Sequence, residues 1–139
     1  MGWNLIIGEL IILLLIYFFF ALMHLIAVLF SDWKGLAAVY PSQEIPEVIQ
    51  FRMRRVVVDK GFFPLGLNVK VTTSGLNLSS PWIFRFGLPS IHIPWEDLKL
   101  IKREKLIIEM VTFEARLRPE TYIAIPIEIF YEAEKFLPE

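Results

Sequence analysis

The sequence predicts an N-terminal transmembrane α-helix followed by a mainly-β domain of about seven antiparallel strands with an α-helix at its C-terminal end. Three observations predict this fold class. Residues 10–30 form an uninterrupted apolar run, residues from about 49 onward alternate apolar and polar side chains, and apolar residues after Pro126 recur at helical spacing. We expect three parts: a transmembrane anchor at residues 1–31, a juxtamembrane helix and linker at 32–46, and the β domain at 47–139.

The apolar run is 21 residues long and contains no Asp, Glu, Lys, Arg, Gly or Pro. As a helix it would be about 31 Å long, which matches the hydrocarbon thickness of a bilayer. A water-soluble helix keeps a polar stripe, whereas this run is apolar on all sides. The run is too long for a signal peptide, no Lys or Arg precedes it and no small-residue cleavage site follows it, so we expect a retained signal anchor.

The distribution of charge predicts an orientation in the membrane. All 14 Lys and Arg residues follow the apolar run. The positive-inside bias then predicts a single-pass protein of the cell (inner) membrane with its N-terminus outside and its C-terminal domain in the cytoplasm. Trp3 and Trp33 flank the run as interfacial aromatic residues would. Because 14 of the 15 acidic residues also follow the run, the remaining chain is neutral, and we expect no nucleic-acid partner.

Side chains that carry out catalysis are scarce. There is no Cys, and one of the two His residues, His24, lies inside the apolar run. Glu96 and Asp97 are neighbours, and in an extended segment they point to opposite faces, so they do not form an acid/base pair. The glycines are isolated rather than grouped in a phosphate-binding loop. We therefore expect a protein that is not an enzyme, with no metal and no cofactor.

Two ionisable residues are associated with the anchor. Glu9 comes just before the run, where it either reaches the headgroup layer or contacts the transmembrane segment of a partner subunit. His24 lies about one and a half turns from the end of the run, where it either forms an interhelical hydrogen bond with a partner or faces the interface. About 22 Å of helix separates them, so they do not pair within one chain. Both are candidate intramembrane contacts with other membrane-protein subunits.

After the run, the sequence predicts a short helix that ends before Pro41. Its apolar face is expected to lie along the membrane surface or at the base of the β domain, and it consists of Trp33, Leu36, Ala37 and Tyr40. A polar connector then holds the β domain close to the bilayer. The strands are expected to curl into a barrel or sandwich whose open end the C-terminal helix covers. His92 alternates with apolar neighbours and is expected to face outward. The expected strands are residues 49–54, 67–72, 76–79, 82–86, 90–93, 98–103, 106–113 and 121–125.

Part of the β domain resembles a known family. The segments that carry the resemblance are Gly75-Leu76-Asn77-Leu78, Phe84-Arg85-Phe86 and Ile91-His92-Ile93-Pro94-Trp95-Glu96-Asp97-Leu98. Their order is similar to the signature of bacterial PH-like (pleckstrin-homology-like) and GRAM-like domains, over about residues 47–137. The resemblance implies a PH-like antiparallel β-barrel or sandwich capped by the C-terminal helix, in a small bacterial membrane protein. It brings no catalytic residues with it.

Basic and aromatic residues cluster around the first predicted turn of the β domain. They are Arg52, Arg54, Arg55, Lys60, Phe62, Phe63 and Lys70. Three interpretations stay open: a solvated strand face with an apolar loop folded over the core, a contact with lipid headgroups, or a contact with a protein partner. Each Lys or Arg near an anionic surface contributes about 1 kcal/mol, which matters little to a tethered domain, so such a patch would orient the domain rather than recruit it.

The expected function is that of a membrane-anchored interaction module. We expect an accessory or scaffold subunit of a larger membrane complex, in contact with the bilayer and with other subunits through the transmembrane helix and the β domain. The alternative is a membrane-surface module that senses lipid headgroups. An enzyme of unknown type is disfavoured by the scarcity of catalytic side chains.

Overall fold

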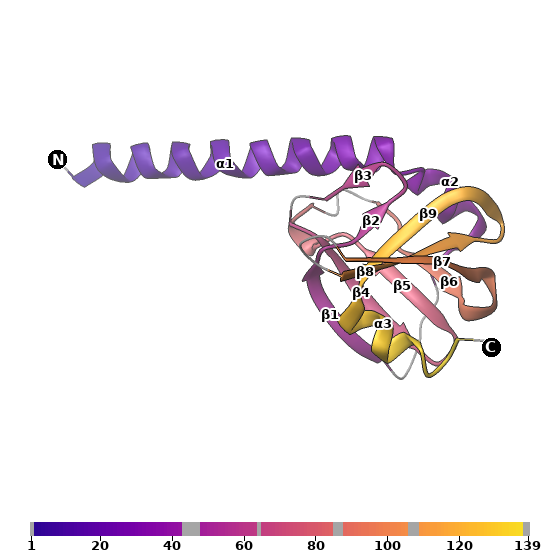
Figure 1. Cartoon of the computed structure of the whole chain (residues 1–139). Helices are drawn as coiled ribbons and strands as arrows, with labels where there is room; N and C mark the ends of the chain where they lie inside the picture. Colours follow the sequence, from indigo (N-terminus) through magenta and orange to yellow (C-terminus); the bar gives the residue numbers. More distant parts are fainter. Residues whose placement is uncertain (1, 43–47, 64, 85–87, 106–108, 138–139) are drawn as a thin grey trace.

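The computed structural model describes residues 2–42, 48–63, 65–84, 88–105 and 109–137. The chain begins with α1 (Gly2–Phe30), one continuous helix that is long and apolar enough to cross a membrane. The most apolar window of α1 has a mean hydropathy of 2.8. Figure 1 shows α1 lying along one side of a β domain and projecting far beyond it. The apolar run of residues 10–30 is thus only part of a longer helix, which begins at Gly2 in the segment that precedes the run.

A turn at Ser31 and Asp32 leads into α2 (Trp33–Val39), the short helix predicted before Pro41. Its predicted common face packs inward, because Trp33 and Leu36 are both completely buried. The prediction of Trp33 as an interfacial residue was wrong. Its indole Nε1 donates a hydrogen bond of 2.9 Å to the carbonyl oxygen of Pro89, so the ring belongs to the core of the β domain.

The described strands form two antiparallel sheets. One sheet has the order β1-β4-β5-β6, and the other has the order β3-β2-β9-β8-β7. The bounds of the first sheet are β1 (Val48–Arg54), β4 (Leu67–Thr72), β5 (Gly75–Ser79) and β6 (Ile91–Pro94). The bounds of the second are β2 (Val57–Val58), β3 (Gly61–Phe62), β7 (Leu98–Lys105), β8 (Glu109–Ala115) and β9 (Arg118–Pro126).

One hydrophobic core joins the two sheets and the helices. It takes side chains from both sheets, from α2 and from the last turns of α1. The predicted C-terminal helix is present as α3 (Ile127–Ala133), and its buried face includes Ile129 and Phe130. Phe130 packs against Phe113 of β8 with a centroid distance of 6.1 Å. Residues 127–133 therefore close the core, as the apolar spacing after Pro126 predicts.

Three details differ from the predicted β domain. Trp82–Phe84 is a 3-10 turn (η1) rather than a strand, because the Phe84 amide donates to the Pro81 carbonyl oxygen at 2.9 Å. The short hairpin of β2 and β3 lies where a loop was expected, which raises the strand count among the described residues above seven. Within the described ranges the two sheets do not close into a barrel.

His92 is also placed differently from the prediction. It was expected on the outer face of its strand, yet only 3% of its surface is exposed. Its Nε2 lies 3.2 Å from the Ser74 hydroxyl oxygen. The free edge of β6 is paired as well, because the His92 amide donates to the Tyr40 carbonyl oxygen at 3.1 Å and Pro41 forms a bridge to Ile91. A side chain that alternation assigns to solvent is here buried by tertiary contacts.

Candidate membrane-facing site

The last turns of α1 pack directly on the β domain. His24 is completely buried, and its Nε2 lies 2.8 Å from the Ser80 hydroxyl oxygen. Its ring lies between Phe63 and Phe84, with centroid distances of 5.0 and 5.4 Å. The Nε2 atom of this polar side chain therefore has a hydrogen-bond partner inside its own chain, whereas the buried Nδ1 atom has none among the described residues. Neither environment expected for His24, a partner's helix or the interface, anticipated this contact.

Tyr17 extends the docking contact toward the N-terminal half of α1. Its hydroxyl donates a hydrogen bond of 2.7 Å to the carbonyl oxygen of Ile83 in η1. Its ring stacks on Phe84 with a centroid distance of 5.6 Å. The contact therefore runs along α1 from the level of Tyr17 to Val28, a rise of about 16 Å.

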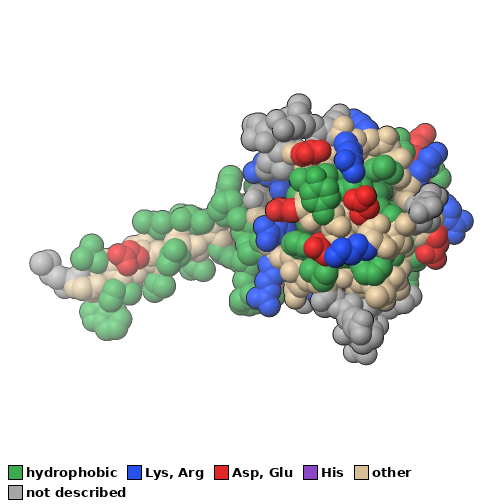
Figure 2. Space-filling model, turned by 60° about the horizontal axis from the view of Figure 1, so that its bottom comes forward, with side chains coloured by type: hydrophobic (Ala, Val, Ile, Leu, Met, Phe, Trp, Pro, Cys, Tyr) green, Lys and Arg blue, Asp and Glu red, His purple; other side chains and the backbone are tan. Residues whose placement is uncertain are grey.

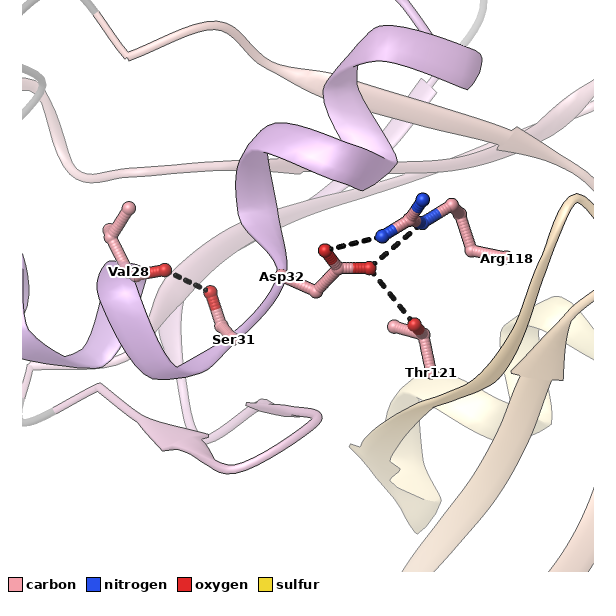
Figure 3. A network of polar contacts seen from close by, with 5 residues as sticks. All are labelled: Val28, Ser31, Asp32, Arg118 and Thr121. Atoms are coloured by element: carbon pink, nitrogen blue, oxygen red, sulfur yellow. Dashed lines mark hydrogen bonds and ion pairs between the residues drawn. The ribbon is translucent and has the colours of Figure 1, made fainter.

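An ion pair fixes the turn between α1 and α2 (Figure 3). The Asp32 carboxylate accepts two hydrogen bonds from the Arg118 guanidinium, at 2.7 and 2.9 Å, and one from the Thr121 hydroxyl at 3.0 Å. Ser31 donates its hydroxyl proton to the Val28 carbonyl oxygen at 2.9 Å. These bonds connect the end of the helix to the start of β9.

Gly61 allows the closest approach between β3 and α1. A Cβ atom at this position would collide with the carbonyl oxygen of Ala27 and would lie 2.7 Å from the Cβ atom of Ser31. Ala27 is itself small, which brings the two backbones together. Three kinds of contact therefore hold the C-terminal half of α1 against the β domain.

A groove of about 480 Å³ opens on the domain beside this docking contact. Its lining includes Arg54, Arg55, Phe62 and Phe63. The Arg55 guanidinium lies 5.9 Å from the centroid of the Phe62 ring, and Phe62 is exposed. Figure 2 shows Lys and Arg side chains along the edge of the domain nearest the helix. The lining also includes Glu128, whose carboxylate lies 3.8 Å from the Arg54 guanidinium, so the groove combines apolar surface with charges of both signs.

The structure gathers only part of the predicted basic and aromatic cluster. Arg52 and Lys60 are exposed but do not line the groove, and Lys70 lies in β4 opposite Gln50. Phe63 is 1% exposed and packs on His24, so the apolar loop is half folded over the core and half open. The alternation of residues in the sequence does not predict which of these side chains line the groove, because the bulge in β1 between Phe51 and Arg54 shifts the strand register.

Ser80, Ile83 and Tyr17 are site residues that the sequence reasoning missed. One signal was available: Ala21 and Ala27 are the only alanines in α1, and they flank His24 at intervals of three residues. Small residues at helical spacing around a polar one mark a face that packs closely on protein. The partner residue Ser80 had no comparable signal, because it lies at a predicted strand end.

The remaining buried titratable groups serve packing. Burial lowers the pKa of His92, which lies 3.2 Å from the Ser74 hydroxyl. Burial also raises the pKa of Tyr40, whose hydroxyl accepts the Leu117 amide at 2.9 Å. Among the residues that the structure describes, no three His, Asp or Glu side chains come together as metal ligands would.

The chain matches no protein-family profile, no curated protein and no solved structure. Its resemblance to PH-like domains stays a prediction.

Proposed function

We propose that α1 crosses the membrane once and holds the β domain against the cytoplasmic face of the inner membrane as a non-enzymatic interaction module. In this role the protein is an accessory or scaffold subunit of a larger membrane complex. The observation that carries the proposal is the docking of α1 on the β domain through His24, Tyr17 and Gly61. A signal sequence that is later removed has no reason to supply core residues, whereas Ala27 and Val28 belong to the domain's core.

The docking contacts limit how far α1 can enter a bilayer. The β domain first meets the helix at the level of Tyr17 with the uncharged turn η1, whose exposed Trp82 suits the membrane interface, and Ser80 lies beside His24 farther along the helix. A β domain with solvated backbone and charged side chains does not enter hydrocarbon. The lipid-spanning part therefore ends near Phe20 rather than near Phe30.

The charges of the groove support the same boundary. Arg54 and Arg55 share the groove with Phe63, whose ring packs on His24. If the lipid-spanning part of an upright helix continued to Phe30, these two guanidinium groups would lie within the hydrocarbon layer, which is costly. With the boundary near Phe20, they lie in or near the headgroup layer instead.

The boundary also changes the expected environment of Glu9. This residue precedes Phe20 by 11 positions, or about 16 Å of helix, which places it near the middle of a hydrocarbon layer about 30 Å thick. Figure 2 shows an acidic side chain on the otherwise apolar projecting helix. Ionisable groups at this depth face protein or water, so we propose that Glu9 contacts a membrane-spanning helix of a partner subunit.

Two experiments test the anchor and the complex. The native sequence has no Cys, so Gly2→Cys and Thr73→Cys each provide one labelling site. In intact cells, an impermeant maleimide should label Gly2→Cys and should label Thr73→Cys only after permeabilisation. Blue-native electrophoresis of source membranes in mild detergent should give a species larger than the monomer. Migration as a monomer, or release by alkaline carbonate, contradicts the proposal.

The groove favours a second function, recognition of anionic lipid headgroups. The Arg55 guanidinium beside the exposed Phe62 ring suits a phosphate and the start of an acyl chain, whereas Arg54 also faces the Glu128 carboxylate of the groove at 3.8 Å. The test compares proteolysis of the full chain in vesicles with and without phosphatidylglycerol. The native protein is compared with the double variant Arg54→Gln/Arg55→Gln. Lys99→Gln is the control, because it also replaces a cationic side chain by a neutral amide. If anionic lipid fails to protect the Phe62 region from proteolysis in the native protein, or protects the double variant equally, this function is excluded.

A further inference from the structure

The turn η1 carries the most exposed large apolar side chain among the residues that the structure describes. Trp82 is 80% exposed, whereas the next most exposed ones in the β domain, Tyr131 and Phe62, are 56% and 55% exposed. Phe84, two residues after Trp82, is buried. The turn thus has one end in the packed interior and a tryptophan ring at its tip. Such a ring, with a single polar N–H group, suits a place that is apolar on one side and wet on the other.

Contacts with two levels of α1 hold η1 at a fixed height on the helix. The Tyr17 hydroxyl donates to the Ile83 carbonyl oxygen at 2.7 Å, and the Tyr17 ring stacks on Phe84 with a centroid distance of 5.6 Å. Two helical turns farther along, the His24 ring packs on the same Phe84 ring at 5.4 Å. Because η1 is attached at both levels, the depth of Trp82 in a membrane is set by the depth of Tyr17.

This depth coincides with the proposed lipid boundary near Phe20. Tyr17 precedes Phe20 by three residues, so it lies about 4–5 Å inside the hydrocarbon, and the turn beside it lies at the border with the headgroups. Tryptophan is enriched at this level of membrane proteins. The other exposed aromatic tip lies farther out, because Gly61, next to Phe62, packs on Ala27 about 10 Å past the boundary. Trp82 is thus the deeper of the two tips.

The segment that leads to Trp82 is suited to the edge of a bilayer in charge and in backbone hydrogen bonding. Residues 71–84 contain no Asp, Glu, Lys or Arg. Pro81 has no amide N–H group, and its carbonyl oxygen accepts the Phe84 amide at 2.9 Å. The Ile83 carbonyl oxygen accepts the Tyr17 hydroxyl. Since unpaired backbone groups are costly in hydrocarbon, a turn with these groups already paired can reach the border of the hydrocarbon at low cost.

We infer that Trp82 inserts into the bilayer interface and gives the protein a second membrane contact beside α1. This inference rests on the proposed membrane anchor, and the occupant is lipid because η1 is attached to α1 where the helix leaves the hydrocarbon. Figure 1 shows the β domain on one side of α1, so the contact lies off the helix axis. Interfacial tryptophans help to set the tilt of a membrane-spanning helix. Trp82 therefore fixes the direction in which α1 tilts, since tilting away from the β domain would lift the ring out of the interface.

Depth-dependent fluorescence quenching of the full chain tests the insertion. Trp82→Cys, Phe62→Cys and Leu117→Cys each place one thiol in a protein that otherwise has none, and a nitrobenzoxadiazole fluorophore is attached to it. In vesicles of phosphatidylethanolamine and phosphatidylglycerol, lipids with a nitroxide at the top of the acyl chain should remove most of the fluorescence at residue 82. The loss should be smaller at residue 62 and close to zero at residue 117. Iodide in the water should quench the three probes in the reverse order.

Leu117→Cys is the matched control, because Leu117 is also an exposed apolar residue of the β domain. Its neighbour Arg118 pairs with Asp32, which follows Phe20 by twelve residues and so lies about 18 Å past the proposed boundary. Equal lipid quenching at residues 82 and 117 overturns the inference. Shielding of residue 82 from iodide without quenching by lipid would mean that protein covers the turn, and it overturns the inference as well.

The native tryptophan gives a second test that needs no label. The fluorescence that Trp82→Phe removes from the spectrum is the signal of Trp82, and in vesicles with brominated acyl chains this difference signal should be largely quenched. A difference signal that brominated lipid leaves unchanged contradicts the inference. If the protein stays in carbonate-washed membranes while lipid fails to quench at residue 82, the inference fails and the anchor stands; release by carbonate overturns the anchor itself.

Discussion

The two halves of α1 have similar compositions and opposite surroundings. In residues 2–20, no side chain is fully buried, although Tyr17 contacts η1 at the end of this half. In the second half, Ala21, His24, Ala27 and Val28 are all buried against the β domain. Hydropathy does not separate these halves, since the predicted run of residues 10–30 crosses the boundary between them. The difference teaches that one apolar helix can combine an exposed segment with a segment that belongs to the core of a domain.

The largest expected effect comes from breaking the docked half at Gly61. Gly61→Val should lower the free energy of unfolding by about 3 kcal/mol, because the new side chain collides with the Ala27 carbonyl. Gly8→Val is the matched change in the exposed half of α1, because nothing lies within 4 Å of a Cβ atom placed at Gly8. In this variant the β domain should unfold at the same temperature as in the native protein. Thermal unfolding in detergent followed by near-UV circular dichroism measures both. Equal unfolding temperatures would show that β3 does not pack on α1.

In the exposed half of α1, residues 2–20, the substitution with the largest expected effect is at Glu9. Glu9→Leu should make insertion of α1 more favourable by about 2–3 kcal/mol, because a charged side chain near the middle of the bilayer is removed. The measurement is a glycosylation-based insertion assay on the full chain. Glu9→Gln, which keeps the shape and removes the charge, should give most of the gain. An effect near zero for both variants would place Glu9 at the interface.

At the end of the docked half, Asp32→Ala should cost about 2 kcal/mol of unfolding free energy. The change leaves Arg118 and Thr121 without their acceptor at a partly buried site. The control is Glu132→Ala, which removes an exposed pair with Lys135 and should cost at most about 0.5 kcal/mol. Denaturant titration compares the two, and similar costs would mean that the ion pair in Figure 3 does not fix the turn.

The hydrogen bond between His24 and Ser80 should be worth about 1 kcal/mol. A double-mutant cycle of His24→Ala and Ser80→Ala isolates this coupling from the loss of packing against Phe63 and Phe84. Denaturant midpoints of the native protein, the two single variants and the double variant supply the four values. Additive costs would show that the two side chains do not interact.

The smallest effect is a pH dependence inside the β domain, away from α1. Burial lowers the pKa of His92 below its ordinary value of 6.5, so the unfolded chain binds the proton first as the pH falls. The free energy of unfolding should therefore decrease below about pH 6.5 and stay constant above about pH 7.5. His92→Asn should flatten the profile between pH 7 and 5. A slope that survives the substitution belongs to another group.

Much of the secondary structure could be predicted from periodicity. The alternation around Val69 and Leu78 and the helical spacing from Ile129 to Ala133 match β4, β5 and α3, because one face of each element is buried. The turn η1 was missed because Trp82 and Ile83 have the composition of a strand, while the hydrogen bond from Tyr17 and the Pro81 turn decide its shape. The groove was half predicted: its arginines are visible in the sequence, but the β1 bulge that separates Arg54 from Arg52 is not.

The sequence by itself determined that this chain has one long apolar helix followed by a β-rich domain. It did so because hydrophobicity and its period are local properties of the chain. Only the tertiary structure decided which part of the helix packs against the β domain, since that depends on Ser80 and Ile83, which contact His24 and Tyr17 across more than fifty residues of sequence. Contacts of this kind come from the packing of whole elements, and no local pattern encodes them.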